Sequence, residues 1–258
     1  MSGVATIGFG AMARSLAESL GRDPRAPQIT DCLLRPGAAG PSGLRLHHRA
    51  ETLIDARPAL VVECAGPAAI AEHGPALLSA GIDLAIVSVG ALCDDALHAR
   101  LLCAARDGGA QMLPVTGAIG GLDLLEAARL AGLDSVTYRG IKPPPAWAGS
   151  PAEQLIDLGA LRGATVFYRG TARQAAGAFP KNANVAAAAA LAGTGLDATQ
   201  VELVADPEAT GNRHEILARG AFGEMRFEVT NRPLPGNPRT SWLAALSVEA
   251  LVRAHAGR

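Results

Sequence analysis

Val4-Ala5-Thr6-Ile7-Gly8-Phe9-Gly10-Ala11-Met12-Ala13 decides the fold of this chain. The first four residues predict a short buried strand, and a helical pattern follows the glycines as far as residue 20. Strand, tight turn and helix form the context in which the spacing G-x-G-x-x-A binds a dinucleotide. Gly8 permits the turn, and Gly10 lets backbone amides approach a pyrophosphate. We therefore predict cofactor contacts at Gly8, Gly10, Ala11 and Met12.

Strands and helices continue to alternate through the rest of the N-terminal half. Apolar runs predict strands at residues 29–34, 59–65, 83–89 and 111–115, with helical segments between most of them. Near-continuous apolar strands separated by helices imply a parallel sheet that is covered on both faces. The sequence thus predicts a Rossmann-type, doubly wound dinucleotide-binding domain over residues 1–116. Gly66, directly after one of these strands, is expected at the cofactor crevice.

The second strand bears on the choice between NAD and NADP. In this fold an acidic residue at the end of that strand accepts the ribose hydroxyls of NAD. Here the chain reads Leu34-Arg35-Pro36 instead. Without the acid a 2′-phosphate is not repelled, and Arg35 is placed to pair with one, although a solvated loop arginine fits the sequence nearly as well. NAD and NADP therefore both stay open as the cofactor.

Residues 117–239 change in pattern and predict a second, substrate-binding domain. Strand-like segments at residues 135–139, 164–169, 201–205, 215–220 and 224–230 suit an antiparallel or mixed sheet with one covered face. A last helix, within residues 240–258, has apolar residues at helical spacing and is expected to pack back on the first domain. The predicted class is α/β, with a Rossmann-type domain followed by an α+β domain.

Composition excludes several classes of function. The chain has 258 residues, a net charge of -1 and only 3% aromatic residues, so it offers no basic face or stacking platform for nucleic acid. No apolar run approaches the roughly 18 residues of a membrane helix, and the strand pattern begins at Gly3, so we expect a cytoplasmic protein without a membrane partner. Four cysteines without CxxC spacing or a histidine at ligand distance predict reduced core thiols and no metal site.

A polar stretch in the second half reads Phe179-Pro180-Lys181-Asn182-Ala183-Asn184-Val185, and His214 follows 30 residues after Asn184. The stretch places amides, a cation and an imidazole in an otherwise alanine-rich region, which is typical of a site that holds a polar ligand and moves a proton. Lys181 and Lys142 are the only lysines of the chain. The sequence therefore predicts that the chemistry lies in this half.

Several motifs together resemble the L-aspartate dehydrogenase family. They are the N-terminal glycine motif, Gly117-Ala-Ile-Gly-Gly-Leu-Asp123, Gly170-Thr-Ala-Arg173, residues 179–185, Asp206-Pro207 with His214, and Asn237-Pro-Arg-Thr-Ser-Trp-Leu-Ala-Ala-Leu246. The resemblance implies that NAD or NADP oxidises L-aspartate to iminoaspartate, which hydrolyses to oxaloacetate and ammonia or feeds NAD biosynthesis. It also implies that His214 is catalytic and that Ala118 and Asn184 contact the nicotinamide side of the cofactor. We expect the protein to be a homodimer.

The two carboxylates of aspartate need cations and aligned hydrogen-bond donors. Lys181 and Arg173 are the candidate cations, and Asn182, Thr240 and Ser241 are candidate neutral donors. Each has an ordinary alternative. Lys181 suits a solvated helix start, Arg173 a surface ion pair, and Thr240 or Ser241 the cap of the last helix.

His214 is the candidate for the proton transfer. Oxidation of an amino acid leaves a proton to be removed from the nitrogen or from the water that attacks the imine, and imidazole has a suitable ordinary pKa near neutrality. Breaker and turn residues precede His214, which predicts that it lies on or beside a loop. A half-buried structural histidine is the plain alternative.

Two other functions remain open. A reductase of the same two-domain architecture would act on another small dicarboxylate. A nucleotide-sensing protein would keep the fold without turnover. His214 together with Lys181 and the two asparagines favours an enzyme over a sensor.

Overall fold

The computed structural model describes residues 3–257, apart from the side chains of Lys181, Pro238 and Arg239. The chain forms two compact units, and each is described by itself. Unit 1 comprises Met1–Val115 with Ala245–Arg258, and unit 2 comprises Thr116–Ala244. Lys181, a predicted substrate contact, therefore has a side chain that lies outside the described part.

Unit 1 is built on a six-stranded sheet with all neighbouring strands parallel, in the order β3-β2-β1-β4-β5-β6. Its strands are β1 (Val4–Ile7), β2 (Ile29–Leu33), β3 (Arg45–His47), β4 (Leu60–Glu63), β5 (Asp83–Ile86) and β6 (Met112–Pro114). This order is that of the Rossmann fold, which confirms the predicted class. The sequence did not predict β3, because the strand has three residues and two of them are exposed.

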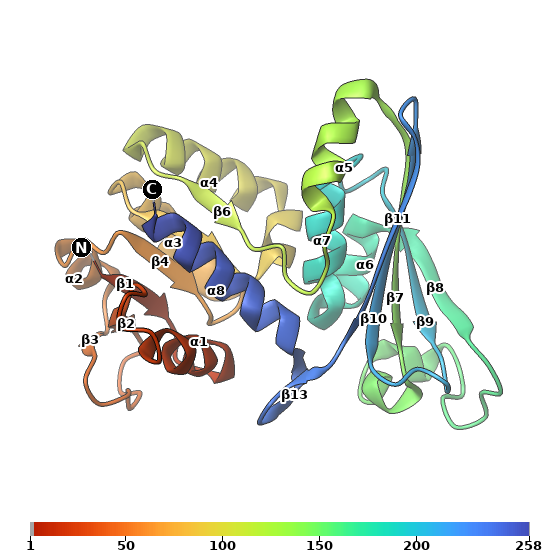
Figure 1. The fold of residues 1–258 in the computed structure, drawn as a ribbon, viewed down its shortest axis with the longest axis horizontal. Helices are drawn as coiled ribbons and strands as arrows, with labels where there is room; N and C mark the ends of the chain where they lie inside the picture. Colours follow the sequence, from red (N-terminus) through yellow and green to blue (C-terminus); the bar gives the residue numbers. More distant parts are fainter. Residues whose placement is uncertain (1–2, 258) are drawn as a thin grey trace. The chain divides into compact units, whose positions relative to one another are not determined.

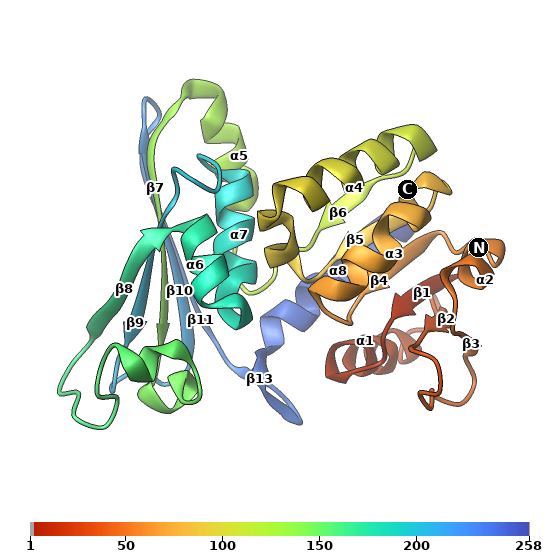
Figure 2. The ribbon, with the colours of Figure 1, turned by 180° about the vertical axis from the view of Figure 1, so that it is seen from behind.

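Helices cover both faces of this sheet. They are α1 (Ala11–Gly21), α2 (Ala50–Asp55), α3 (Pro67–Ser79), α4 (Asp95–Gly108) and the C-terminal α8 (Trp242–Ala256). Figures 1 and 2 show α8 on one face and α3 and α4 on the other. Val248 and Val252 of α8 join Val4, Leu16 and Leu20 in one buried cluster. Burying such a side chain contributes about 1.5–3 kcal/mol, so α8 stabilises this unit although it is distant in sequence.

Unit 2 is built on a five-stranded sheet with the order β11-β10-β7-β9-β8. Its strands are β7 (Leu133–Lys142), β8 (Thr165–Thr171), β9 (Gln200–Ala205), β10 (Asn212–Gly220) and β11 (Gly223–Asn231). β7 and β9 are parallel and the other pairs antiparallel, so the sheet is mixed, as predicted. A small hairpin of β12 (Pro233–Leu234) and β13 (Asn237–Ser241) leads to α8.

Three helices lie on one face of the second sheet (Figures 1 and 2). They are α5 (Leu122–Ala128), α6 (Ala172–Ala178) and α7 (Ala183–Ala192). α7 is made almost entirely of alanine, which combines the highest helix propensity with a small side chain, and most of its residues are buried. The helix can therefore lie close to its neighbours, which fixes the position of Asn182 just before it.

Two of the boundaries that differ from those expected bear on the candidate site. β10 begins at Asn212, three residues earlier than residue 215, so the strand includes His214. α8 begins at Trp242, since residues up to Ser241 belong to β13. Within residues 3–257, no helix is both long and apolar enough to cross a membrane.

Candidate active site

A cavity of about 440 Å³ opens at the carboxyl ends of β1, β2 and β4 in unit 1. This is the point where the strand order reverses, and nucleotides bind at such a point in open parallel sheets. The predicted residues Gly8, Gly10 and Arg35 line the cavity. Its other lining residues are Ile7, Phe9, Leu33, Leu34, Ala38, Cys64, Ala65, Ala68, Ala69, Glu72 and His73. Gly66 lies between lining residues and precedes α3 with a φ of 104°.

The glycine motif has the shape that a dinucleotide needs. Gly8 has a φ of 80°, and a Cβ there would lie 2.9 Å from the Cβ of Ala65. A Cβ at Gly10 would meet nothing within 4 Å, so the space above this residue is open. Gly10 precedes α1 without a side-chain cap, which leaves the first amides of the helix, at Ala11 and Met12, directed at an anion site. The residues present therefore fit a pyrophosphate.

A buried carboxylate organises the neighbouring loops. Glu63 ends β4 and is fully buried. Its Oε1 accepts a hydrogen bond from the amide of Ala65 at 2.8 Å, and its Oε2 accepts one from the amide of Ser88 at 2.9 Å. Glu63 thus joins the loops that follow β4 and β5. Glu63 was not among the residues predicted from the sequence, although a carboxylate at the end of an apolar strand was a visible signal.

Arg35 is exposed at the mouth of this cavity, in the loop after β2. The acid within β2, Asp31, is buried and turned toward β3. Its carboxylate accepts from Arg45 Nε at 2.7 Å and lies 2.7 Å from His47 Nε2. Asp31 is therefore engaged inside the unit and does not replace the missing ribose acid.

His214 is the third residue of β10 and is only 5% exposed, so it lies beside the preceding loop, as one form of the prediction had it, and not on the loop. It pairs with Gly140 of β7, and its Nδ1 is 2.7 Å from the Oη of Tyr138. A Cβ at Gly140 would lie 3.0 Å from that Oη, so glycine leaves room for the hydroxyl. Tyr138 and Gly140 are two residues apart and share one face of the sheet with His214.

The sequence suggested that His214 has the ordinary pKa of an imidazole, near neutrality, and the structure does not agree. Burial, helped by the positive charge of Lys142, lowers the pKa of His214 to about 3. Desolvation and a nearby cation both disfavour the imidazolium form. The imidazole is therefore neutral in the substrate-free protein at neutral pH.

Lys142 is the last residue of β7 and is partly buried. Its Nζ donates a hydrogen bond to Oδ1 of Asn182 and lies 4.9 Å from the ring centroid of Trp147. Burial lowers the pKa of Lys142 to about 8. The structure thus brings the predicted Asn182 together with a lysine to which the sequence assigned no role, although the scarcity of lysine pointed to it.

The loop before α5 is held by Asn231, a residue that was not predicted from the sequence. Ala118 is buried, and its carbonyl accepts a hydrogen bond from Nδ2 of Asn231 at 3.1 Å. Gly121, at the end of the loop, has a φ of 76°, and a Cβ there would overlap the ring of Phe227. The loop is therefore fixed against β11. Asn184 is exposed on the first turn of α7.

The remaining predicted substrate contacts are engaged within unit 2. Arg173 donates to Asp197 from Nε at 2.7 Å and from Nη2 at 2.8 Å, which is the ion pair named as its ordinary alternative. Thr240 accepts a hydrogen bond from Asn237 at 2.9 Å. Ser241 is buried at the end of β13. The edge of the Arg173 guanidinium formed by Nε and Nη2 is therefore already paired with Asp197.

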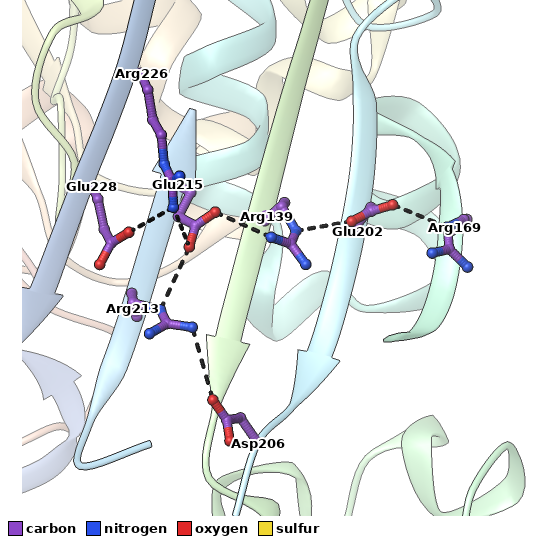
Figure 3. Close-up of polar contacts among 8 residues, drawn as sticks. All are labelled: Arg139, Arg169, Glu202, Asp206, Arg213, Glu215, Arg226 and Glu228. Atoms are coloured by element: carbon purple, nitrogen blue, oxygen red, sulfur yellow. Dashed lines mark hydrogen bonds and ion pairs between the residues drawn. The ribbon is translucent and has the colours of Figure 1, made fainter. Parts of the chain in front are cut away.

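The other face of the second sheet carries a network of ion pairs (Figure 3). Arg139 and Glu215 alternate with Tyr138 and His214 along their strands and so project to the opposite face. Glu215 lies 3.2 Å from Arg139 Nη1, and the network contains four arginines and four carboxylates. Its members are Arg139, Arg169, Arg213, Arg226, Glu202, Asp206, Glu215 and Glu228. The charges of this network are therefore balanced.

Comparisons with known proteins cover both units. Residues 8–114 match the family described as "Homoserine dehydrogenase, NAD binding domain", and residues 123–255 match "Aspartate dehydrogenase, C-terminal". The L-aspartate dehydrogenase of Ruegeria pomeroyi is 50% identical over 254 residues, which cover 97% of this chain and 91% of that protein. That of Cupriavidus necator is 48% identical, with 98% of each chain covered. The crystal structure of aspartate dehydrogenase from Thermotoga maritima matches with a TM-score of 0.80 and 27% identity over 98% of this chain and 96% of that one.

Proposed function

Because this chain belongs to the L-aspartate dehydrogenase family, we propose how its own residues carry out the reaction of an NAD(P)-dependent L-aspartate dehydrogenase. The enzyme oxidises L-aspartate, and the bound nicotinamide cofactor supplies the acceptor for the hydride that leaves Cα. The observation that carries the proposal is the buried His214, held by Tyr138 and lowered in pKa by burial and by the charge of Lys142. The tasks left to the protein are to bind and orient the substrate and to move a proton.

His214 moves the proton in this proposal. Its Nε2 accepts a proton from the substrate nitrogen, or from the water that attacks the imine. For Nε2 to be free, the ring hydrogen must lie on Nδ1 and be donated to the Oη of Tyr138, 2.7 Å away. Burial raises the pKa of Tyr138, so the phenol keeps its own proton and remains an acceptor of this hydrogen bond. Tyr138 is then a positioning residue that holds the ring of His214 and accepts the hydrogen of Nδ1 in the tautomer that leaves Nε2 free.

A low pKa in the substrate-free protein is compatible with this role. Burial and the charge of Lys142 are the two causes of the low pKa of His214. The two carboxylates of L-aspartate bring negative charge into the pocket, and nearby negative charge favours the protonated imidazole. His214 therefore becomes a stronger base when the substrate is in place.

The cofactor contacts proposed in unit 1 are the residues predicted from the sequence, and three of them, Gly8, Gly10 and Arg35, line the cavity. The glycine loop and the start of α1 would hold the pyrophosphate, and Arg35 would face the 2′-phosphate of NADP. The full set in this unit is Gly8, Gly10, Ala11, Met12, Arg35 and Gly66. In unit 2 the resemblance supports Ala118 and Asn184 as contacts of the nicotinamide side.

The substrate contacts proposed from the sequence are Lys181, Arg173, Asn182, Thr240 and Ser241. Among these, Asn182 is placed beside a partly buried cation, since its Oδ1 accepts a hydrogen bond from Lys142. We further propose a cytoplasmic homodimer whose iminoaspartate feeds NAD biosynthesis, as the resemblance implies. Light scattering that gives the mass of a single chain would contradict the dimer.

The proposed function predicts which amino acid the wild-type enzyme oxidises. We expect it to reduce NAD or NADP with L-aspartate, and to oxidise the reduced cofactor with oxaloacetate only when ammonia is present. L-Glutamate should be poorer by on the order of 10²-fold in kcat/KM, the discrimination that one extra methylene allows. Spectrophotometry at the nicotinamide absorbance measures all of these rates.

The same measurement separates the two alternatives. Equal activity with L-malate or L-glutamate would support a dehydrogenase or reductase for another small dicarboxylate. Binding of the cofactor without turnover of any of these substrates would support a nucleotide sensor.

A further inference from the structure

Lys142 differs from the other cations of its sheet in what surrounds it. The arginines of the ion-pair network on the other face of the sheet each lie within ion-pair distance of a carboxylate (Figure 3). Lys142 contacts an amide oxygen and the face of an indole, which are both neutral. Among the side chains that the structure describes, no carboxylate forms an ion pair with Lys142.

Asp206 is joined to Lys142 by a backbone hydrogen bond, but its carboxylate has other partners. Asp206 donates its amide hydrogen to the carbonyl of Lys142 at 2.9 Å. Its own side chain, however, accepts a hydrogen bond from the amide of Glu208 at 3.0 Å and lies 3.8 Å from Arg213 of the ion-pair network. A partly buried ammonium with neutral partners alone is costly, because amide and aromatic groups compensate only part of the lost hydration.

Lys142 lies on the same face of the sheet as His214, the proposed site of proton transfer. Tyr138, Gly140 and Lys142 are spaced by two residues on β7 and therefore lie along one face of the sheet. Gly140 is the register partner of His214. The charge of Lys142 also acts on His214, since it adds to burial in lowering the pKa of the imidazole.

We propose that Lys142 binds a carboxylate of L-aspartate, with Asn182 holding the ammonium in place until the substrate arrives. The inference rests on the proposed function, because it assigns a ligand within that same site. A carboxylate supplies the opposite charge that Lys142 lacks, and a hydrogen bond between the ammonium and a charged carboxylate is stronger than the one to the neutral amide oxygen of Asn182. Lys142 then determines the preference for acidic substrates, while His214 handles the proton.

The test compares Lys142→Met and Lys142→Arg with the wild-type enzyme. Lys142→Met keeps the length of the side chain and removes the charge, so the KM for L-aspartate should rise by about 10–10²-fold, the usual effect of losing a hydrogen bond to a charged group. The inhibition constant of succinate, a dicarboxylate with no amine to deprotonate, should rise in parallel. Lys142→Arg should keep both constants within a few-fold of wild type. The KM for NAD should be unchanged in both variants.

The thermal unfolding midpoint without substrate separates a binding role from a structural one. Removing a partly buried charge that has no ion-pair partner should leave the midpoint of Lys142→Met unchanged or raise it. A lower midpoint with kcat and both KM values impaired together would make Lys142 structural and overturn the proposal. A fall in kcat at unchanged KM would also overturn it, since the lysine would then act in proton transfer.

Two controls keep the result independent of the proposed function. Arg162→Met removes an exposed positive charge of the same unit and should change neither constant. Wild-type activity with L-aspartate tests the function alone. If that activity is present and the succinate constant is the same in wild type and Lys142→Met, the inference about Lys142 fails while the function stands.

Discussion

His214→Ala is expected to lower kcat with L-aspartate by about 10²–10⁴-fold, the usual contribution of a general acid or base. The imidazole is the group to which we assign the proton of the substrate nitrogen or of the attacking water. Affinity for the cofactor should hardly change, because His214 does not line the cavity of unit 1. Steady-state kinetics and a cofactor titration of the same preparation measure both quantities.

Companion variants show which property of His214 matters. His214→Asn can still form a hydrogen bond but cannot accept a proton near neutral pH, so its kcat should fall as far as that of the alanine variant. Tyr138→Phe leaves the ring hydrogen on Nδ1 without its acceptor. Losing this hydrogen bond costs about 1–2 kcal/mol, so kcat should fall by roughly 5–30-fold. His98→Ala, on α4, should behave as wild type. If His214→Asn keeps most of its kcat, the histidine is structural.

The pH dependence of His214 follows from its low pKa. This pKa is about 3 in the folded, substrate-free protein against an ordinary value of 6.5, so the unfolded chain binds more protons between these two values. The contribution of His214 to stability is therefore fully present above pH 6.5 and is lost as the pH falls toward 3. Accordingly, kcat/KM should show no limb from His214 between about pH 5 and 8, because the free imidazole is neutral throughout.

Arg35→Asp is expected to raise the KM for NADP by about 10–10²-fold relative to that for NAD, since a hydrogen bond to a charged group is lost. The new carboxylate would also repel a 2′-phosphate and accept the ribose hydroxyls of NAD. Arg106→Asp makes the same charge change on α4, outside the cavity, and is the matched control. If the KM values for NADP and NAD change in parallel, Arg35 does not contact the 2′-phosphate.

The parts of the fold that the sequence predicted are those set by local pattern. Residues 4–13 define strand, turn and helix within one short segment, and the buried strands of unit 1 are nearly continuous apolar runs. The mixed sheet of unit 2 follows from segments rich in β-branched and aromatic residues. The three-residue β3 has no such signal, because its side chains are mainly exposed and Asp31 fixes it from another strand.

The parts of the site that the sequence did not predict depend on contacts between distant segments. His214 was expected on or beside a loop because turn residues precede it, and pairing with β7 extends β10 to include it. Its partner Tyr138 is 76 residues away, and Lys142 is 40 residues from Asn182. No spacing rule connects positions across strands whose register is unknown. The low pKa of His214 likewise arises from burial, which only the folded structure defines.

The most direct test of the central claim is to follow the hydrogen that leaves Cα of the substrate. The wild-type enzyme would be given L-aspartate with deuterium at Cα and NAD, and the reduced cofactor would be isolated and analysed by mass spectrometry. Hydride transfer predicts that the deuterium appears at C4 of the nicotinamide and that turnover is not faster than with unlabelled substrate. Reduced cofactor without deuterium, or no reduced cofactor at all, would contradict the account.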